Sequence, residues 1–439
     1  MGEPLGSPKA SDPMTMPFRR LFALGLVVAG CQGFVTDELT GLSGLTGVDG
    51  GAVGDSGTVV VDTPDAAVAA DGSVFDAGTP PVIDAGPELI SLFVANGHQG
   101  RTIISCDDGK TWVANQSDNP AFVCWGPNNT GNPDGGSNDC DHTENSGHGV
   151  EFSNGWFVAS YGHGAPGSVR RSRDGVNWVR SLEGSNFDAL VVGAGGTMLA
   201  ANRSPSWSRD DGLTWQRGPD AEFVNSNGDP IWNVRAATFG NGEFAMFAAD
   251  STHEVRVTVD GGQAWVHADF PDVCGAAYTV GFGSGGGRML YVDQATACVS
   301  TDGMHFTAHA LPAGAESGPM WSGTEFLVWG NRGDPTYERI VMRSADGVTW
   351  TTTALATRTA LPDGGFQLGG APVVGAVGHN ANGTFAMVNG GWEAWYDRQQ
   401  FYRSTDGITW DVLPHTAFVG SHPIGRIVSG RVERPAICK

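Results

Sequence analysis

Short apolar runs alternate with polar turns along this chain, and the runs recur in a fixed order. Each unit has a run such as Gly155–Ser160 (GWFVAS) or Glu325–Gly330 (EFLVWG), then a loop, then a run such as SVRRS or RIVMRS. A polar turn follows, and the next run opens on an aromatic residue, as in TWVAN and TWDVL. Runs of this length between turn residues are typical of β-strands. No long stretch has the three-to-four-residue period of an amphipathic helix, so we predict an all-β fold.

A fourth run precedes the two middle runs, for example at Ile231–Phe239 and Pro372–Gly378. Seven units of four strands, each of about fifty residues, predict a seven-bladed β-propeller. The first unit, from Leu89, lacks this inner run, whereas the C-terminus has one left over at His422–Val432. We therefore expect the C-terminal strand to complete blade one and close the ring, which removes exposed strand edges.

The polar turn between the third and fourth strand is the most regular feature. Ser or Thr stands two residues before an Asp, Gly follows within two residues, and an aromatic residue comes four or five after the Asp. The Asp can accept hydrogen bonds from backbone N–H groups ahead of it, Gly supplies the positive φ of the reversal, and the aromatic ring packs. A structural role is therefore expected for seven carboxylates, those of Asp107, Asp174, Asp210, Asp260, Asp302, Asp346 and Asp406.

These seven turns, from SCDDGKTW at Ser105 to STDGITW at Ser404, resemble the Asp-box of the sialidase-like, BNR-repeat β-propellers. The copies vary mainly at the penultimate position, and one ends in Phe306. In that family the box is a folding device remote from the ligand site. The resemblance implies that ligands bind on the opposite face, called the loop face below, which carries the loops entering each inner strand and those between the middle strands.

The first 31 residues are predicted to be a signal peptide. Arg19 and Arg20 precede an apolar run that ends in Val28-Ala29-Gly30-Cys31, which resembles a bacterial lipobox and implies cleavage before Cys31 and acylation of its thiol. Gln32 after the Cys favours the outer membrane by the same resemblance, and an ordinary secretory signal is the alternative. A transmembrane helix is not expected, because the run has about ten residues, half of what a bilayer requires. Membrane contact is then expected through the lipid anchor only.

Residues 32–87 are rich in Gly, Asp and Ala, with few aromatic residues, so we predict a disordered tether. Its acids suggest calcium, but their spacing is irregular and a solvated linker is the simpler interpretation. The propeller then spans residues 88–439, and we expect a monomer. The chain has 66 Gly, 14 Trp and a formal net charge of −22. This charge argues against nucleic acid as a partner, because phosphate contacts require a basic face.

Six cysteines remain after Cys31, and an even number in an exported chain suggests three disulfides, for which sequence permits fifteen connectivities. The expected topology narrows the choice. Cys274 and Cys298 fall in blade five, Cys124 and Cys140 bracket one loop, and Cys438 follows the closing strand and can reach Cys106 in blade one. We therefore expect these three pairings.

The loop face has aromatic side chains beside acids and arginines. Flat apolar faces on which sugars stack, next to polar groups that bond hydroxyls, favour a ligand-binding surface; interblade packing of the tryptophans is the alternative. The predicted ligand-binding residues are Trp232 and Arg235 in blade four, Arg332 and Tyr337 in blade six, and Trp392, Trp395, Tyr396 and Arg398 in blade seven.

Six histidines also map to this face, in blade one, blade two and the junction into blade one: His98, His142, His148, His163, His415 and His422. Imidazoles of this number could hold zinc or copper, although no short ligand spacing such as HxxxH occurs. Solvated or hydrogen-bonded histidines are the alternative, and no cofactor is required by the main interpretation.

A glycoside hydrolase remains a second interpretation, with a carboxylate pair drawn from Asp334, Glu338, Glu393 and Asp397. Sialidases carry an arginine triad, but the nearest counterpart to its first stretch, Pro423–Ile427, departs from the pattern, and no triad can be assigned. Photosystem-assembly factors, which resemble this chain in having seven such blades, are binding scaffolds without catalysis. The sequence therefore favours a lipid-anchored binding protein for an extracellular glycan or protein.

Overall fold

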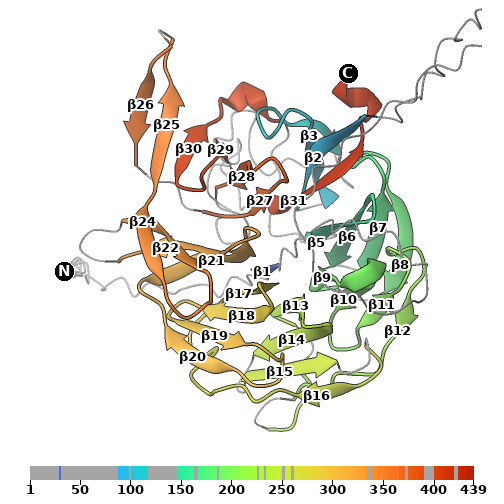
Figure 1. The fold of residues 1–439 in the computed structure, drawn as a ribbon. Coiled ribbons are helices and arrows are strands. Elements are labelled where there is room, and N and C mark those ends of the chain that lie inside the picture. The colour runs from blue at the N-terminus through green and yellow to red at the C-terminus, as the bar shows by residue number, and fades with distance from the viewer. Residues whose placement is uncertain are drawn as a thin grey trace, which may run out of the picture.

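The structure is a computed structural model that describes residues 29–30, 88–97, 100–116, 146–162, 167–184, 187–224, 227–231, 234–249, 253–258, 262–333, 338–362, 364–370, 374–389, 400–419 and 424–439. The strands form seven sheets arranged as a ring (Figure 1), and the four blade strands of each sheet pair antiparallel. The predicted all-β, seven-bladed β-propeller is therefore confirmed.

The strands of each blade follow in order from the inner to the outer edge. Blade one has β31 (Ile424–Glu433), β2 (Leu89–Gly97), β3 (Thr102–Ser105) and β4 (Val113–Gln116). Blade two has β5 (Ser146–Ser153), β6 (Trp156–Gly162), β7 (Gly167–Ser172) and β8 (Val179–Gly184). Blade three has β9 (Ala189–Val192), β10 (Met198–Ala201), β11 (Ser206–Ser208) and β12 (Gln216–Arg217). Blade four has β13 (Ala236–Gly240), β14 (Glu243–Ala249), β15 (His253–Thr258) and β16 (Trp265–His267).

The remaining three blades have the same order. Blade five has β17 (Thr279–Gly285), β18 (Arg288–Asp293), β19 (Thr296–Ser300) and β20 (Thr307–Ala310). Blade six has β21 (Gly314–Trp321), β22 (Phe326–Asn331), β23 (Arg339–Ser344) and β24 (Thr351–Ala354). Blade seven has β27 (Val377–His379), β28 (Phe385–Val388), β29 (Phe401–Ser404) and β30 (Thr409–Val412). Short 3₁₀ turns lie at Ala194–Gly196, His415–Ala417 and Ala436–Cys438.

The ring closes as predicted, because the surplus C-terminal strand completes blade one. β31 is the innermost strand of blade one and pairs antiparallel with β2, from Leu89 opposite Glu433 to Gly97 opposite Ile424. Seven apolar clusters fill the spaces between successive blades, including one between blades seven and one. In that cluster the buried Trp112 ring lies 5.1 Å from the Phe401 ring, centroid to centroid. First and last blades thus share a core in the same way as neighbours in sequence.

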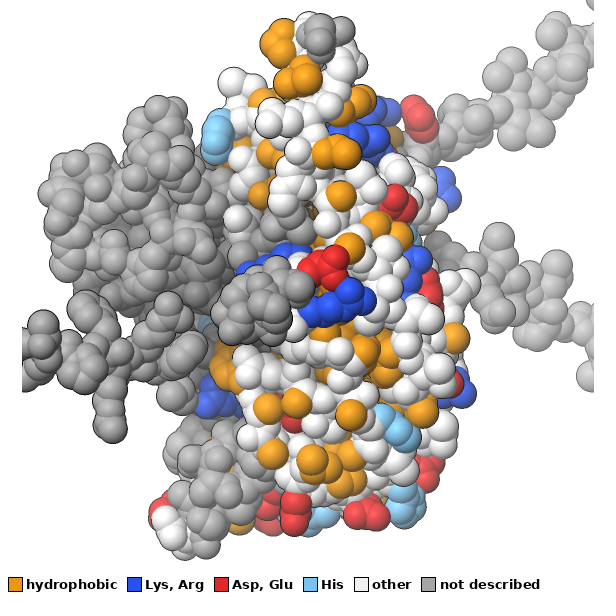
Figure 2. Space-filling view, turned by 90° about the vertical axis from the view of Figure 1, so that its left-hand side faces the viewer, with side chains coloured by type: hydrophobic (Ala, Val, Ile, Leu, Met, Phe, Trp, Pro, Cys, Tyr) orange, Lys and Arg blue, Asp and Glu red, His pale blue; other side chains and the backbone are white. Residues whose placement is uncertain are grey.

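Two elements were not anticipated. Blade seven carries a hairpin of β25 (Ala356–Ala360) and β26 (Phe366–Gly369), in which β25 pairs in parallel with the outer strand β30. The hairpin projects beyond the rim, and hydrophobic side chains gather on it at the top of Figure 2. Phe366 and Leu368 are 55% and 73% exposed. The Arg358 guanidinium joins the hairpin to the blade by pairing with Asp411 at 2.5 Å.

The second is β1 (Ala29–Gly30), which pairs in parallel with β13 at the inner edge of blade four. Both residues belong to the predicted signal peptide, whose cleavage stays a prediction, as do the boundaries of the tether. No helix within the described ranges has the length and apolar character needed to cross a bilayer.

Candidate functional site

The recurring turns use their carboxylates internally. In blade six, Asp346 Oδ1 accepts hydrogen bonds from the N–H groups of Thr349 (2.7 Å) and Val348 (2.9 Å) and from the Ser344 hydroxyl (2.9 Å). Gly347 adopts a φ of 73°, which favours glycine. The backbone bonds from Thr349 and Val348 lower the pKa of Asp346 to about 2. The carboxylate therefore stays ionised and is saturated by its own turn.

The other turns have the same bonds. In each, the Asp accepts a hydrogen bond from a backbone N–H two to four residues ahead, and this holds for Asp107, Asp174, Asp210, Asp302 and Asp406. Asp260 lies outside the described residues. Carboxylates committed in this way are poor candidates for ligand binding, so the site is sought on the loop face.

Blade six contributes a fixed ion pair to the loop face. Arg332 and Glu338 stand at the two ends of the loop between β22 and β23, and Arg332 Nη1 lies 2.5 Å from Glu338 Oε2. Arg332 Nη2 also donates to the Thr352 hydroxyl at 2.6 Å, while its backbone N–H donates to the Glu338 carbonyl at 3.0 Å. The Arg332 side chain remains 44% exposed. Arg332, a predicted ligand residue, is therefore held in one position with donors still facing solvent.

Behind this pair lies a second, less exposed polar group. Glu316 in β21 accepts hydrogen bonds from Arg339 and from the Asn331 side-chain amide. Desolvation lowers the pKa of the Arg339 guanidinium. Ser317, the next residue, donates to the Gly375 carbonyl at 2.8 Å and so joins blade six to blade seven. Glu316 thus bonds the last residue of β22 and the first residue of β23, and so fixes both ends of the loop between them.

Blades three and four meet at a buried acid that the sequence analysis missed. Asp188 precedes inner strand β9, is 5% exposed, and accepts a hydrogen bond from the Val234 N–H at 3.0 Å. Burial raises the pKa of Asp188 to about 7, although the Val234 N–H and the charge of Arg235 lower it. Arg235, a predicted ligand residue, thus lies at the entrance of inner strand β13, close enough to influence this acid.

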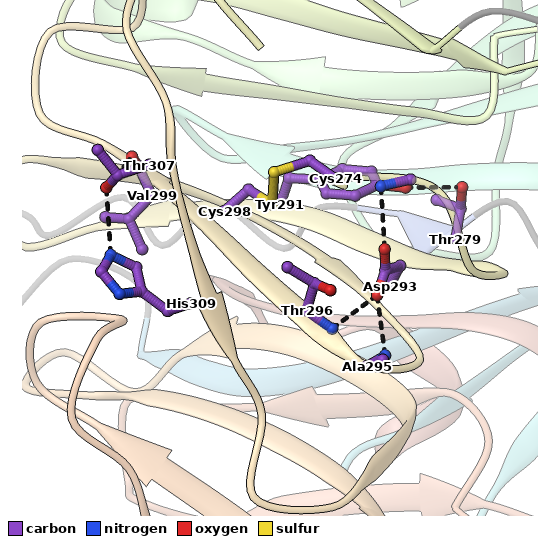
Figure 3. Close-up of a disulfide and its surroundings, with 11 residues drawn as sticks. Cys274, Thr279, Tyr291, Asp293, Ala295, Thr296, Cys298, Val299, Thr307 and His309 are labelled. Atoms are coloured by element: carbon purple, nitrogen blue, oxygen red, sulfur yellow. Dashed lines mark hydrogen bonds between the residues drawn. A yellow bond between two sulfur atoms is a disulfide. The ribbon is translucent and has the colours of Figure 1, made fainter. Parts of the chain in front are cut away.

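Figure 3 shows the corresponding loop of blade five, which enters β17. Cys274 and Cys298 form a disulfide there, as predicted. The buried Asp293 accepts hydrogen bonds from the N–H groups of Gly275 (2.9 Å), Ala295 (2.8 Å) and Thr296 (2.6 Å). One carboxylate therefore fixes both loop-face loops of this blade. Its position directly after the apolar run MLYV was visible in the sequence.

The second predicted disulfide, Cys106–Cys438, is also present and joins the turn of blade one to the segment after β31. The predicted pair Cys124–Cys140 lies outside the described residues, as does Cys31.

Most predicted loop-face residues likewise lie outside the described residues. These are the ligand-binding candidates Trp232, Tyr337, Trp392, Trp395, Tyr396 and Arg398, the catalytic candidates Asp334, Glu393 and Asp397, and the metal candidates His98, His142, His163 and His422. Their roles stay predictions. Among the described candidates, the structure brings Arg332 and Glu338 into direct contact.

Of the six histidines that could bind a metal ion, two lie in the described residues, and their environments differ. His148 lies in inner strand β5 and is 4% exposed, whereas His415 is exposed and meets the Phe418 ring edge to face with ring centroids 5.5 Å apart. Within the described ranges, no three His, Cys, Asp or Glu side chains are grouped closely enough to hold a metal ion.

A second buried acid, Glu151, also escaped the sequence analysis. It lies in β5 and is 3% exposed, and its Oε2 has no hydrogen-bond partner among the described residues. Burial raises the pKa of Glu151 well above its usual range, although the charge of Arg426 on β31 lowers it. Its place between apolar residues in the run GVEF could have indicated a buried acid from the sequence.

No protein-family model matches this chain, and no curated protein sequence matches it. Solved propeller structures are similar in fold at low identity. YCF48 from Cyanidioschyzon merolae is 16% identical over 64% of this chain and 88% of its own, with a TM-score of 0.42. AztD from Citrobacter koseri is 9% identical over 79% of this chain and 99% of its own, with a TM-score of 0.44. A structure of YCF48 bound to D1 peptide is 14% identical over 61% and 81%, with a TM-score of 0.39. At these values the comparisons carry no argument about function.

Proposed function

We propose that this protein is a non-catalytic propeller that binds an extracellular glycan or protein on its loop face and is held at the outer membrane through acylated Cys31. The observation that carries the proposal is the environment of Arg332. Its ion pair with Glu338 and its bond to Thr352 fix the guanidinium, yet the side chain is 44% exposed. A pre-positioned donor loses little conformational freedom when a ligand binds, which favours recognition.

The two faces differ in how their charged groups are used. The carboxylates of the recurring turns are saturated by backbone N–H groups, as in Asp346. Arg332, in contrast, bonds through two of its nitrogens and has further N–H donors. This contrast supports a ligand on the loop face, where the predicted Trp392 and Trp395 would add stacking surfaces.

A hydrolase is less well supported. A glycosidase needs a proton donor and a second carboxylate flanking the scissile bond. Glu338, the described member of the candidate set, has its Oε2 occupied by Arg332. That oxygen is engaged in a structural ion pair and is poorly placed to protonate a leaving group.

The test is binding of the purified chain to a glycan array and, in parallel, to a peptide array, with mass spectrometry of the eluted ligands. The proposal predicts saturable binding on one of the arrays with intact ligand. It also predicts that Arg332→Ala weakens this binding about ten-fold, the effect of one charge-assisted hydrogen bond. Arg288→Ala is the control, because the one hydrogen bond of its guanidinium within the described residues goes to the Gly286 carbonyl in its own turn. Cleaved ligand would contradict the non-catalytic assignment.

A further inference from the structure

A cavity of about 740 Å³ opens between blades one and two, at the end of the propeller that carries the recurring turns. Its walls come from the start of β2, the end of β31 and the turn between β5 and β6. It therefore lies away from the loop face and is independent of the proposed function.

Three arginines line this cavity, although the chain as a whole has a net charge of −22. Arg431, on β31, is exposed, and its guanidinium makes no ion pair or hydrogen bond with the described residues. Arg434 lies 4.0 Å from Glu88 and 3.5 Å from the Cys438 carbonyl, both at the limit of an interaction. Two of the three guanidinium groups are therefore weakly engaged or unengaged at the cavity wall.

The third, Arg173, is pre-positioned by an aromatic ring. Its guanidinium carbon lies 4.0 Å from the centroid of the Trp156 ring, and that of Arg171 lies 3.4 Å from the same ring. Cation–π contact orients the Arg173 group without using its N–H donors. Arg173 makes no hydrogen bond or ion pair within the described part of the chain.

The acids at the cavity do not neutralise these cations. Asp174 points its carboxylate into its own turn, where it accepts hydrogen bonds from the N–H groups of Val176 (2.9 Å) and Asn177 (2.7 Å). Among the described lining residues, Glu433 is the other acid and is exposed, and Glu88 lies outside the lining at 4.0 Å from Arg434, so two exposed carboxylates face three guanidinium groups. Phe152, Val432 and the half-exposed Leu89 give the cavity an apolar wall beside the cations.

We infer that this cavity binds a small organic anion, with its phosphate or carboxylate at Arg173, Arg431 and Arg434 and its apolar part against Leu89 and Phe152. Guanidinium groups recognise both kinds of anion through paired N–H donors. The apolar wall then selects an organic anion over an inorganic one, because burying apolar surface adds to the affinity.

Isothermal titration of the purified chain with phenyl phosphate, benzoate, inorganic phosphate and benzyl alcohol tests the inference. We expect one-to-one binding of phenyl phosphate, benzoate or both, tighter than that of inorganic phosphate, and none of benzyl alcohol. Arg173→Gln and Arg431→Gln should each weaken binding about ten-fold. Arg180→Gln, which removes an exposed arginine already paired with Glu183, should leave it unchanged.

Ala436→Trp fills the cavity while keeping all three arginines, and it should abolish binding even if a glutamine variant does not fold. Absence of saturable binding by both organic anions would overturn the inference. So would inorganic phosphate binding as tightly as phenyl phosphate, or equal weakening by Arg180→Gln, which would indicate general ionic attraction only.

Discussion

Arg403 in the last blade and Asp108 in the first form an ion pair, with Arg403 Nη2 2.6 Å from Asp108 Oδ2. The same carboxylate accepts hydrogen bonds from the Asn380 amide and the Thr384 hydroxyl, each at 2.6 Å. Asp108 can reach blade seven because it is an extra residue in its turn, with a φ of 65°. The ring is thus closed by a side-chain network in addition to strand β31.

Asp108→Ala should lower the free energy of unfolding by about 2–3 kcal/mol, because it removes the hydrogen bonds to this carboxylate from Arg403, Asn380, Asn382 and Thr384. It also leaves the partly buried Arg403 guanidinium without a carboxylate partner, although Arg403 Nε still donates to the Asp108 carbonyl. Asp211→Ala is the matched control. Asp211 holds the same position in blade three but accepts bonds from two side chains, those of Ser153 (2.8 Å) and Asn154 (3.0 Å). Denaturant titration measures both variants. An equal loss in the two would show that ring closure gains nothing particular from Asp108.

The same network predicts sensitivity to acid. Burial raises the pKa of Asp108, but bonds from Thr384, Asn380 and Arg403 outweigh it and leave the pKa below its usual value. A carboxyl with a lowered pKa in the folded state adds stability above its unfolded pKa, and that stability is lost as pH falls through the folded pKa. Unfolding midpoints measured from pH 6 to pH 2 should therefore fall more steeply for the native chain than for Asp108→Asn. Parallel curves would contradict this.

Asp188 should give the stability of the fold the opposite dependence on pH. Burial raises its pKa to about 7, so the folded state favours the protonated acid. Its contribution is fully present below the unfolded pKa near 4 and is lost as pH rises through about 7, by an amount of a few kcal/mol.

Asp188→Asn keeps an oxygen that can accept from the Val234 N–H and cannot ionise. We expect it to remove this pH dependence and to be more stable than the native chain at pH 8, whereas Asp188→Ala should be less stable at every pH. Thermal unfolding between pH 4 and pH 8 gives both comparisons. A native profile that Asp188→Asn leaves unchanged would exclude titration of this group.

The two disulfides should contribute unequally. Cys106–Cys438 joins residues 332 apart, whereas Cys274–Cys298 joins residues 24 apart. Because a longer closed loop restricts the unfolded chain more, the free-energy loss should be larger for the first, within a range of about 2–5 kcal/mol for each. Paired Cys→Ala variants compared by denaturant titration measure this. A larger loss for the blade-five pair would show that local packing at its buried sulfurs outweighs loop length.

Residues close in sequence made much of the fold predictable. The Asp and Gly of each turn fix the reversal between the third and fourth strands, and the surplus run at the C-terminus identified β31 as the closing strand. The two described disulfides followed from that topology. The hairpin at Ala356–Gly369 could not be predicted, because β25 is short and pairs in parallel with β30, some fifty residues away.

The candidate site was less predictable for a related reason. The high pKa of Asp188 depends on burial between two blades, which no local pattern records. Arg332 and Glu338 were selected by residue type, but only the structure shows that they pair with each other and with Thr352. The sequence indicated which loops could carry a ligand site. The burial, protonation and pairing of each side chain depend on contacts between strands and blades.

The most direct test of the central claim compares one residue on each face in the same chain. Arg332→Ala and Asp346→Ala would be measured for affinity toward the ligand found on the arrays and for thermal unfolding. We expect Arg332→Ala to weaken binding about ten-fold with little change in unfolding temperature, since it removes an exposed ion pair. Asp346→Ala should lower the unfolding temperature and leave the affinity of the folded chain unchanged. Lost affinity in Asp346→Ala with native binding in Arg332→Ala would contradict a binding site on the loop face.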